Sequence, residues 1–197
     1  MLEDIIRIRT TSSKIDHLEF WDDDFFVDQQ RAKEILVFII IKKIKMKIGF
    51  RGVRVSDLYH MDDELLQLME NANTVHLNIG VETGSNKILT LINKGAFSQM
   101  AREVNQRLSL WPNFVPLYNF FSGIPEETIE DIRLSTQLIL QLLKDNPRCQ
   151  ISGYHQYTPY PGNKLFEVAK AHGFKEPKSL EEWGQLRFED NAKNLQK

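Results

Sequence analysis

The chain has 197 residues and a formal net charge of −2, so its bulk charge gives no reason to expect nucleic acid or an anionic membrane as a partner. Its hydrophobic content of 42% is ordinary for a globular protein, and its length suits one domain or a large part of a bigger one. The longest apolar run, 35–41, is far shorter than the roughly 20 residues that span a bilayer. The first residues lack the basic segment and apolar core of a secretory signal. We therefore expect a cytoplasmic protein without a membrane span.

Helical and strand-like patterns alternate from the start of the chain. Residues 2–10 form a helical pattern that no strand precedes, and 15–21 is the first predicted strand. Asp28 is predicted to cap the next helix, because its carboxylate can accept hydrogen bonds from free amides of the first turn. Lysines alternate with apolar residues over 43–47, and this period of two indicates a second strand that ends near Arg54.

The same alternation continues through the middle of the chain. Asp62 is predicted to open a helix, and 75–81 reads as the third strand. Helical patterns cover 85–92 and 98–110, and the fourth strand is predicted over 114–121.

The last predicted units are a long helix over 128–144, a fifth strand over 149–157 and a helix over 165–172. The expected buried face of the long helix consists of Ile132, Leu138, Ile139 and Leu142. Strands that alternate with helices at these spacings pair in parallel through right-handed crossovers. We therefore predict an α/β fold of about five strand–helix units, as a partial barrel or an open parallel sheet.

Acidic residues follow two of the predicted strands, Asp22 and Asp23 after the first and Glu82 after the third. The carboxyl ends of successive parallel strands converge on one mouth of the sheet, where barrel enzymes keep their active sites. These carboxylates are therefore the first candidates for a functional site.

The chain resembles the core of radical S-adenosylmethionine (radical SAM) enzymes, in the branch that carries an N-terminal cobalamin-binding domain. The resemblance rests on motifs spread in order over almost the whole chain: Phe20-x-Asp22-Asp23-x-Phe25, Gly80-Val81-Glu82-Thr83-Gly84-Ser85, Gly123-x-Pro125-x-Glu127-Thr128, Pro159-Tyr160-Pro161-Gly162 and the Gly173 to Trp183 tail. It implies a partial (β/α) barrel of the TIM-like kind that binds S-adenosylmethionine at the carboxyl ends of its parallel strands.

The resemblance also implies a [4Fe-4S] cluster that splits S-adenosylmethionine into a 5′-deoxyadenosyl radical, with cobalamin-dependent methyl transfer left open. The family holds the cluster with a Cys-x3-Cys-x2-Cys loop after its first strand, and this chain has no such loop. Its one cysteine, Cys149, falls in a predicted strand and is not expected to bind a metal. We therefore expect 1–197 to be an incomplete radical SAM domain that lacks the first strand and the cluster loop and is inactive alone. Residues 174–197 are expected to form a C-terminal extension.

By the same resemblance, Asp22 or Asp23 contacts the amino group of the cofactor's methionine and Arg54 holds its carboxylate. Glu82 and Ser85 match the positions that contact the ribose and the carboxylate.

Gly123 and Pro125 match the turn whose backbone lies near the adenine, and Tyr160 is a candidate for stacking on a ligand. The substrate is expected to be a small molecule of unknown identity.

Structural roles are open alternatives at these positions. Asp22 and Asp23 could cap the turn into the next helix, and Glu82 could cap the helix that starts near Ser85. Arg54 could form an ion pair with one of these three acids. The glycine and proline turns could be tight connections and nothing more.

Two other functions remain open as well. One is a noncatalytic module that keeps an S-adenosylmethionine pocket or only the fold. The other is a barrel hydrolase that uses Asp22 or Asp23 with Glu82 as acid and base, since such carboxyl groups lie roughly 5–9.5 Å apart in glycosidases.

Overall fold

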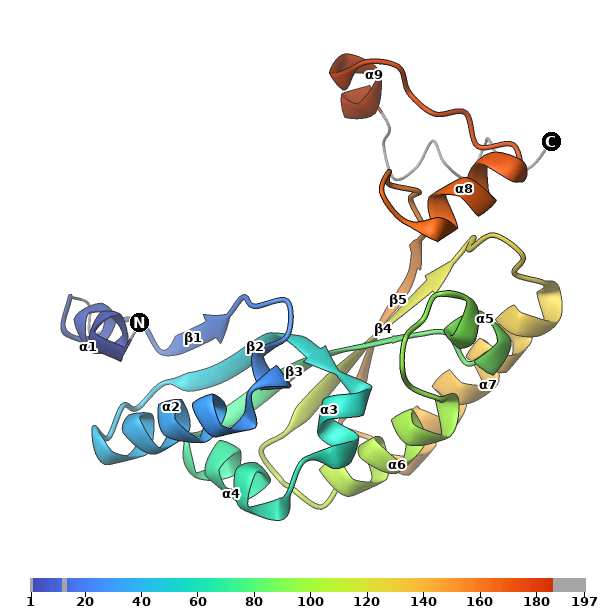
Figure 1. The fold of residues 1–197 in the computed structure, drawn as a ribbon. Helices are drawn as coiled ribbons and strands as arrows, with labels where there is room; N and C mark the ends of the chain where they lie inside the picture. Colours follow the sequence, from blue (N-terminus) through green and yellow to red (C-terminus); the bar gives the residue numbers. More distant parts are fainter. Residues whose placement is uncertain (1, 12–13, 186–197) are drawn as a thin grey trace.

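A single open sheet of five parallel strands organises the computed structural model, which describes residues 2–11 and 14–185 (Figure 1). The strands lie side by side in chain order: β1 (His17–Phe20), β2 (Lys47–Arg54), β3 (Thr74–Glu82), β4 (Val115–Ser122) and β5 (Gln150–Gln156). β1 pairs only with β2 and β5 pairs only with β4, so the sheet does not close. The prediction of a partial parallel α/β barrel is confirmed.

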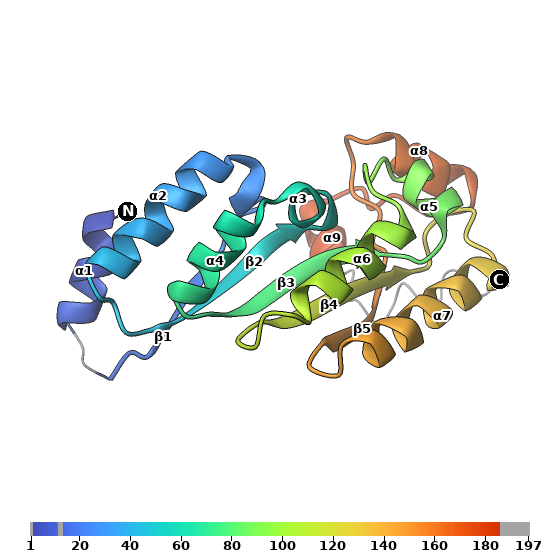
Figure 2. The same ribbon diagram turned by 90° about the horizontal axis from the view of Figure 1, so that it is seen from below.

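A layer of helices covers one face of this sheet, as both ribbon views show (Figures 1 and 2). They are α2 (Gln29–Ile41), α3 (Val55–His60), α4 (Asp63–Asn71), α6 (Ser98–Leu108) and α7 (Ile129–Asp145). α1 (Leu2–Thr11) lies at the β1 end of the sheet, and the 3₁₀ turn η1 (Phe25–Val27) leads into α2. The remaining helices follow the carboxyl ends of the strands: α5 (Asn86–Leu91), α8 (Lys164–Ala171) and α9 (Leu180–Gln185).

The hydrophobic core lies between the sheet and this helical layer. Successive side chains of a strand point to opposite faces, and the buried strand residues are those on the helical side: Ile48, Phe50, Leu77, Ile79, Tyr118 and Phe120. Each such aromatic or aliphatic side chain stabilises the fold by about 1.5–3 kcal/mol when fully buried. The opposite face carries polar side chains, among them Asn78 and Asn119, which are hydrogen-bonded to each other. This polar face is the inner side of the partial barrel.

Most sequence-predicted elements are present, with caps where they were expected. The Asp28 carboxylate accepts a hydrogen bond from the Arg31 amide, and Asp62 does the same for Leu65. β2 begins only at Lys47, because the chain after α2 first reverses through Lys43 at a φ of 51°. The short helices α3 and α9 were not predicted.

One detail of the predicted core is wrong. Ile132, assigned to the buried face of α7, is 39% exposed, whereas the α7 residue fully enclosed at this end is Ser135. A small polar residue stands there because the turn between β3 and α5 lies directly on this part of α7.

Hydrogen bonds join this turn to α7, which lies far from it in the sequence. The Ser135 hydroxyl accepts a hydrogen bond from the Gly84 amide at 2.8 Å and lies 2.9 Å from the Thr83 hydroxyl. Ser85, which caps α5, donates its hydroxyl to the Asp131 carboxylate at 2.6 Å. The start of α5 is thereby fixed to the start of α7.

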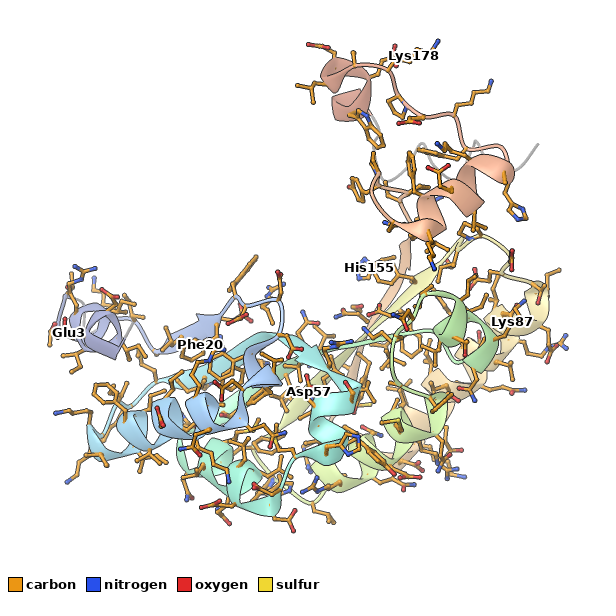
Figure 3. The ribbon with its side chains drawn as sticks, in the orientation of Figure 1. Glu3, Phe20, Asp57, Lys87, His155 and Lys178 are labelled. Atoms are coloured by element: carbon orange, nitrogen blue, oxygen red, sulfur yellow. The ribbon has the colours of Figure 1, made fainter. Side chains whose placement is uncertain are left out.

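Asp131 connects both helix starts through one buried carboxylate. It also accepts the Thr128 amide and hydroxyl in a capping box, and it pairs with the Lys87 ammonium at 2.8 Å (Lys87 is labelled in Figure 3). Burial alone would raise the pKa of Asp131, but the hydrogen bonds from Lys87, Ser85 and Thr128 together hold it well below its usual value. The carboxylate therefore stays ionised at all but strongly acidic pH.

The close approach of the turn to α7 requires glycine at position 84. A Cβ atom there would lie 2.5 Å from the carbonyl oxygen of Leu134 and 2.8 Å from the Cα of Ser135. These are backbone atoms, so a side chain at this position would force the turn and the helix apart.

We predict that Gly84→Ala lowers the free energy of unfolding by about 1–3 kcal/mol, the usual cost of overpacking a well-packed contact. Gly184→Ala is the matched control, because nothing lies within 4 Å of the added methyl group. It should leave stability unchanged or raise it by up to about 1 kcal/mol, since alanine is favoured over glycine in a helix. Urea unfolding of both variants measures the difference, and equal stabilities would show that the turn does not press on α7.

Candidate functional site

A hollow of about 480 Å³ opens at the carboxyl end of β3, β4 and β5. Its wall is mainly apolar and includes Ile92, Phe121, Ile124 and Leu165. We call it the Glu82 hollow, because Glu82 supplies the carboxylate in this mainly apolar wall. Pockets of this size and character, with few polar groups, are typical binding sites for small molecules.

Glu82 occupies an unusual backbone conformation at this hollow. It has a φ of 71°, and the pairing of β3 with β4 shifts register between Gly80 and Glu82. A positive φ at a residue other than glycine costs of order 1–3 kcal/mol and recurs at functional sites. The bulge aims the carboxylate back over Gly80, where a Cβ atom would lie 2.5 Å from Glu82 Oε1.

Only one of the two carboxylate oxygens of Glu82 is satisfied. Oε1 accepts a hydrogen bond from the Lys94 ammonium at 2.5 Å, and this ion pair is largely buried. Oε2 is also buried but has no hydrogen-bond partner in the described part of the chain. An unsatisfied buried carboxylate oxygen is costly, so a ligand group that donates a hydrogen bond to it would be favoured.

A second hollow, of about 440 Å³, lies beside the first and shares Ile124 and Tyr157 with it. Gly123 and Pro125 line it, together with Glu127. Glu127 Oε2 accepts the Gly123 amide at 2.7 Å, and burial raises the pKa of this carboxyl group. The predicted adenine turn is therefore part of a cavity wall, with Gly123 at a φ of 78° that suits glycine.

Arg54, the last residue of β2, contacts the segment after β1 and the segment after α5 at the same edge. Its guanidinium lies 3.6 Å from the Asp24 carboxylate and donates a hydrogen bond to the Lys94 carbonyl at 3.3 Å. The alternative of an ion pair for Arg54 is thus what the structure contains, but the partner is Asp24 and not Asp22, Asp23 or Glu82.

Asp24 also meets a second carboxyl group, that of Asp57 on α3 (Figure 3). Burial raises the pKa of Asp57 to about 6, and a hydrogen bond with Asp24 and the charge of Asp24 add to the rise. Each of the two has one buried carboxylate oxygen without a partner, Asp24 Oδ1 and Asp57 Oδ2. The carboxyl group of Asp57 therefore loses its proton closer to neutral pH than an ordinary aspartate does.

Asp22 and Asp23 lie at the other end of the edge, next to a small hollow of about 330 Å³. Asp22 is already engaged, since it accepts the Asp24 amide at 3.3 Å and pairs with Arg31 at 3.3 Å. This matches the alternative of a turn cap for Asp22. Asp23 is exposed and forms no ion pair with any residue that the structure describes.

Ser85 and Tyr160 differ in their access to the Glu82 hollow. Ser85 is 1% exposed and its hydroxyl is bonded to Asp131, so it faces away from the hollow. Tyr160 lines the hollow and is 60% exposed, with its ring stacked on that of Trp183 at 6.2 Å between centroids. The cap of α5 is Ser85, so the alternative of Glu82 as that cap is wrong.

The structure thus brings Glu82 and Tyr160 to one hollow and places Gly123 and Pro125 in the wall of the adjoining one. Arg54 connects this region to the Asp24–Asp57 pair, while Asp22 and Asp23 lie beside a separate hollow. That these residues bind a cofactor stays a prediction.

Cys149 lies in the hydrophobic core and is 5% exposed. Burial raises the pKa of its thiol to about 11, so it is not a thiolate at neutral pH. In the described ranges, no three His, Cys, Asp or Glu side chains are arranged to hold a metal ion. The same ranges contain no helix with the length and apolar character needed to cross a membrane.

Sequence reasoning missed Lys94, Asp24 and Asp57, the partners of the predicted residues. No role in the site was predicted for Lys94, yet it is the cation that holds Glu82. Asp24 stood in the same acidic run as Asp22 and Asp23, and no pattern in the sequence distinguished it. The C-terminal extension 174–197 is described only to 185, so its last part lies outside the described residues.

The fold defined by this geometry is a partial parallel (β/α) barrel with its hollows at the carboxyl edge. No family model and no curated protein matches the chain. Among solved structures it is similar to the cobalamin-dependent S-adenosylmethionine radical enzyme OxsB with aqua-cobalamin and S-adenosylmethionine bound, at a TM-score of 0.55 and 21% identity over 70% of this chain. The structure of OxsB with aqua-cobalamin alone gives the same values. This chain spans only 21% of the OxsB chain, about a fifth of its length. The likeness shows a shared fold.

The Asp24–Asp57 pair makes stability depend on pH in a defined direction. A carboxyl group whose pKa is raised by folding binds more protons in the folded state, so its effect on stability becomes less favourable as pH rises from about 4 to about 6. We predict that Asp57→Asn raises the melting temperature at pH 7.5 and leaves it nearly unchanged at pH 4. Asp23→Asn is the control, since this exposed residue should change neither value. A destabilised Asp57→Asn protein at pH 7.5 would mean that the ionised form is the one the fold favours.

Proposed function

We propose that this chain is the S-adenosylmethionine-binding part of a radical SAM enzyme core, and that the Glu82 hollow holds the nucleoside of the cofactor. The observation that carries the proposal is the Glu82 carboxylate, held in a strained conformation with one buried oxygen left without a partner. The fold supports it, because the OxsB structure that resembles this chain has S-adenosylmethionine bound.

Different residues of the Glu82 hollow would contact the ribose and the base of the nucleoside. A ribose hydroxyl that donates to Glu82 Oε2 would satisfy that oxygen, while the Lys94 ammonium holds the carboxylate in its orientation through Oε1. Phe121 and Ile124 offer apolar surface to the base, and the exposed Tyr160 ring offers a stacking face at the rim. The hydrogen bonds of Thr83 and Ser85 to α7 fix the turn that directly follows Glu82 and so limit the movement of its backbone.

The residues present do not fit the [4Fe-4S] cluster of the family. Thiolates are its usual ligands, and the chain has one cysteine, which is buried in the core at the far side of the sheet layer. We therefore derive no radical step for this chain by itself. The residues described here would bind and orient S-adenosylmethionine, and the electron for its reductive cleavage would have to come from a cluster held by residues other than these.

Two alternatives are weaker. A barrel hydrolase would need Asp22 or Asp23 at the same hollow as Glu82, but both aspartates line a different one. A module that retains only the fold would need no strained Glu82 and no unsatisfied oxygen beside an apolar hollow.

Calorimetric titration with S-adenosylmethionine tests the proposed binding site. We expect saturable binding that weakens at least tenfold in Glu82→Gln, because the amide cannot keep both the Lys94 ion pair and a hydroxyl acceptor. Glu34→Gln, an exposed change on α2, is the control and should bind like the unchanged protein. If millimolar S-adenosylmethionine releases no heat, the chain shares only the fold of the family and not its cofactor binding. If Glu82→Gln binds S-adenosylmethionine normally, the binding site is not the Glu82 hollow.

A second prediction concerns the cluster. After anaerobic reconstitution with iron and sulfide, the isolated chain should show neither the broad visible absorbance nor the EPR signal of a reduced [4Fe-4S] centre. Cys149→Ser serves as the control, and it should behave like the unchanged chain. A cluster that appears in the unchanged chain and disappears in Cys149→Ser would contradict our assignment of the thiol to the core.

A further inference from the structure

Trp21 is a large aromatic side chain that is 75% exposed and yet held in one orientation. Phe20, the residue before it, points into the core and stacks on Phe50 at 5.3 Å between centroids (Figure 3). Because side chains alternate along a strand, Trp21, which directly follows β1, points to the opposite face of the sheet, the one that the helical layer does not cover.

Two contacts fix the indole ring there. Its Nε1 donates a hydrogen bond to Glu19 Oε2 at 3.1 Å, and the Arg51 guanidinium lies 4.4 Å from the ring centroid. Arg51 also pairs with the same carboxylate at 3.2 Å, so the three side chains form a closed set. A guanidinium over an aromatic ring is attracted by the ring face. One face of Trp21 is therefore covered, and its large exposure means that the other is open.

Trp21 also lines a hollow of about 330 Å³, together with Asp22, Asp23, Arg51 and Gly52. Gly52 allows the loop to sit on β2, since a Cβ atom there would lie 1.8 Å from the Asp22 carbonyl oxygen. Most charges around the hollow are neutralised in pairs: Arg51 by Glu19, and Asp22 by Arg31. The carboxylate of Asp23 is left without an ion pair among the described residues, so the hollow has a net negative end.

We propose that this hollow is a second binding site, separate from the Glu82 hollow, for a flat aromatic ring that carries an ammonium group. The ring stacks on the open face of Trp21, and the ammonium meets the Asp23 carboxylate. A fixed aromatic surface requires little ordering on binding, which favours a ring as the ligand. A charge-assisted hydrogen bond to Asp23 then selects a cation over an anion.

NMR titration of the full chain with tyramine tests this site. The chain has three tryptophans and therefore three indole N–H signals, and the Trp21 signal is the one that disappears in Trp21→Phe. The comparison ligand is 3-(4-hydroxyphenyl)propionate, which has the same ring with a negative charge. We expect tyramine to shift the Trp21 signal saturably, with an affinity at least tenfold higher than that of the anion.

Asp23→Asn should reduce this preference at least fivefold, whereas Asp16→Asn, an exposed change at the opposite end of β1, should leave it intact. Equal affinities for the two probes, a shift confined to the other two tryptophans, or an unchanged preference in Asp23→Asn would overturn the proposal. Saturating S-adenosylmethionine should not displace tyramine. If it does, the hollow belongs to the cofactor site and the proposal of a separate site is wrong. The titrations of the Glu82 hollow do not depend on these outcomes.

Discussion

The contact between the β3–α5 turn and the backbone of α7 is the constraint on which the carboxyl edge depends. Gly84 permits the approach, and Asp131 closes it by accepting hydrogen bonds from Ser85, Thr128 and Lys87. Since Glu82 and Gly123 leave their strands on either side of this contact, its geometry fixes both hollows. The positive φ of Glu82 is maintained because the turn that follows it is fixed to α7.

Charges along this edge are mostly satisfied inside the protein. Arg54 lies beside Asp24, Asp22 pairs with Arg31, and Lys94 holds one oxygen of Glu82. A candidate site is therefore better recognised by a polar group that has no partner than by the number of charged residues nearby. The second oxygen of Glu82 and the carboxylate of Asp23 are two such groups, and they lie at different hollows.

Local patterns predicted the elements well, because capping and periodicity depend on neighbours in the chain. Asp28 and Asp62 cap the helices expected of them, and the strands fall near their predicted ranges. Partner choice was not predictable in this way. Asp131 lies in the first turn of α7, yet one of its partners, Ser85, lies 46 positions earlier in the chain. Likewise nothing near Arg54 indicated that Asp24, among three successive acids, would be its neighbour. Such pairings are set by the packing of distant segments.

The edge strands β1 and β5 are less buried than β2 to β4, and the chain after β5 continues this open character. No residue of β5 is fully buried, and α8 and α9 extend away from the helical layer (Figure 1). Segments with few enclosed side chains open locally at a small fraction of the global unfolding free energy. Amide protons of β5 should therefore exchange with solvent before those of β2 to β4. Tyr157 and Tyr160 belong to this segment, so one wall of the Glu82 hollow should fluctuate more than the others. A bound ligand would hold that wall in place and so slow the exchange of the β5 amide protons.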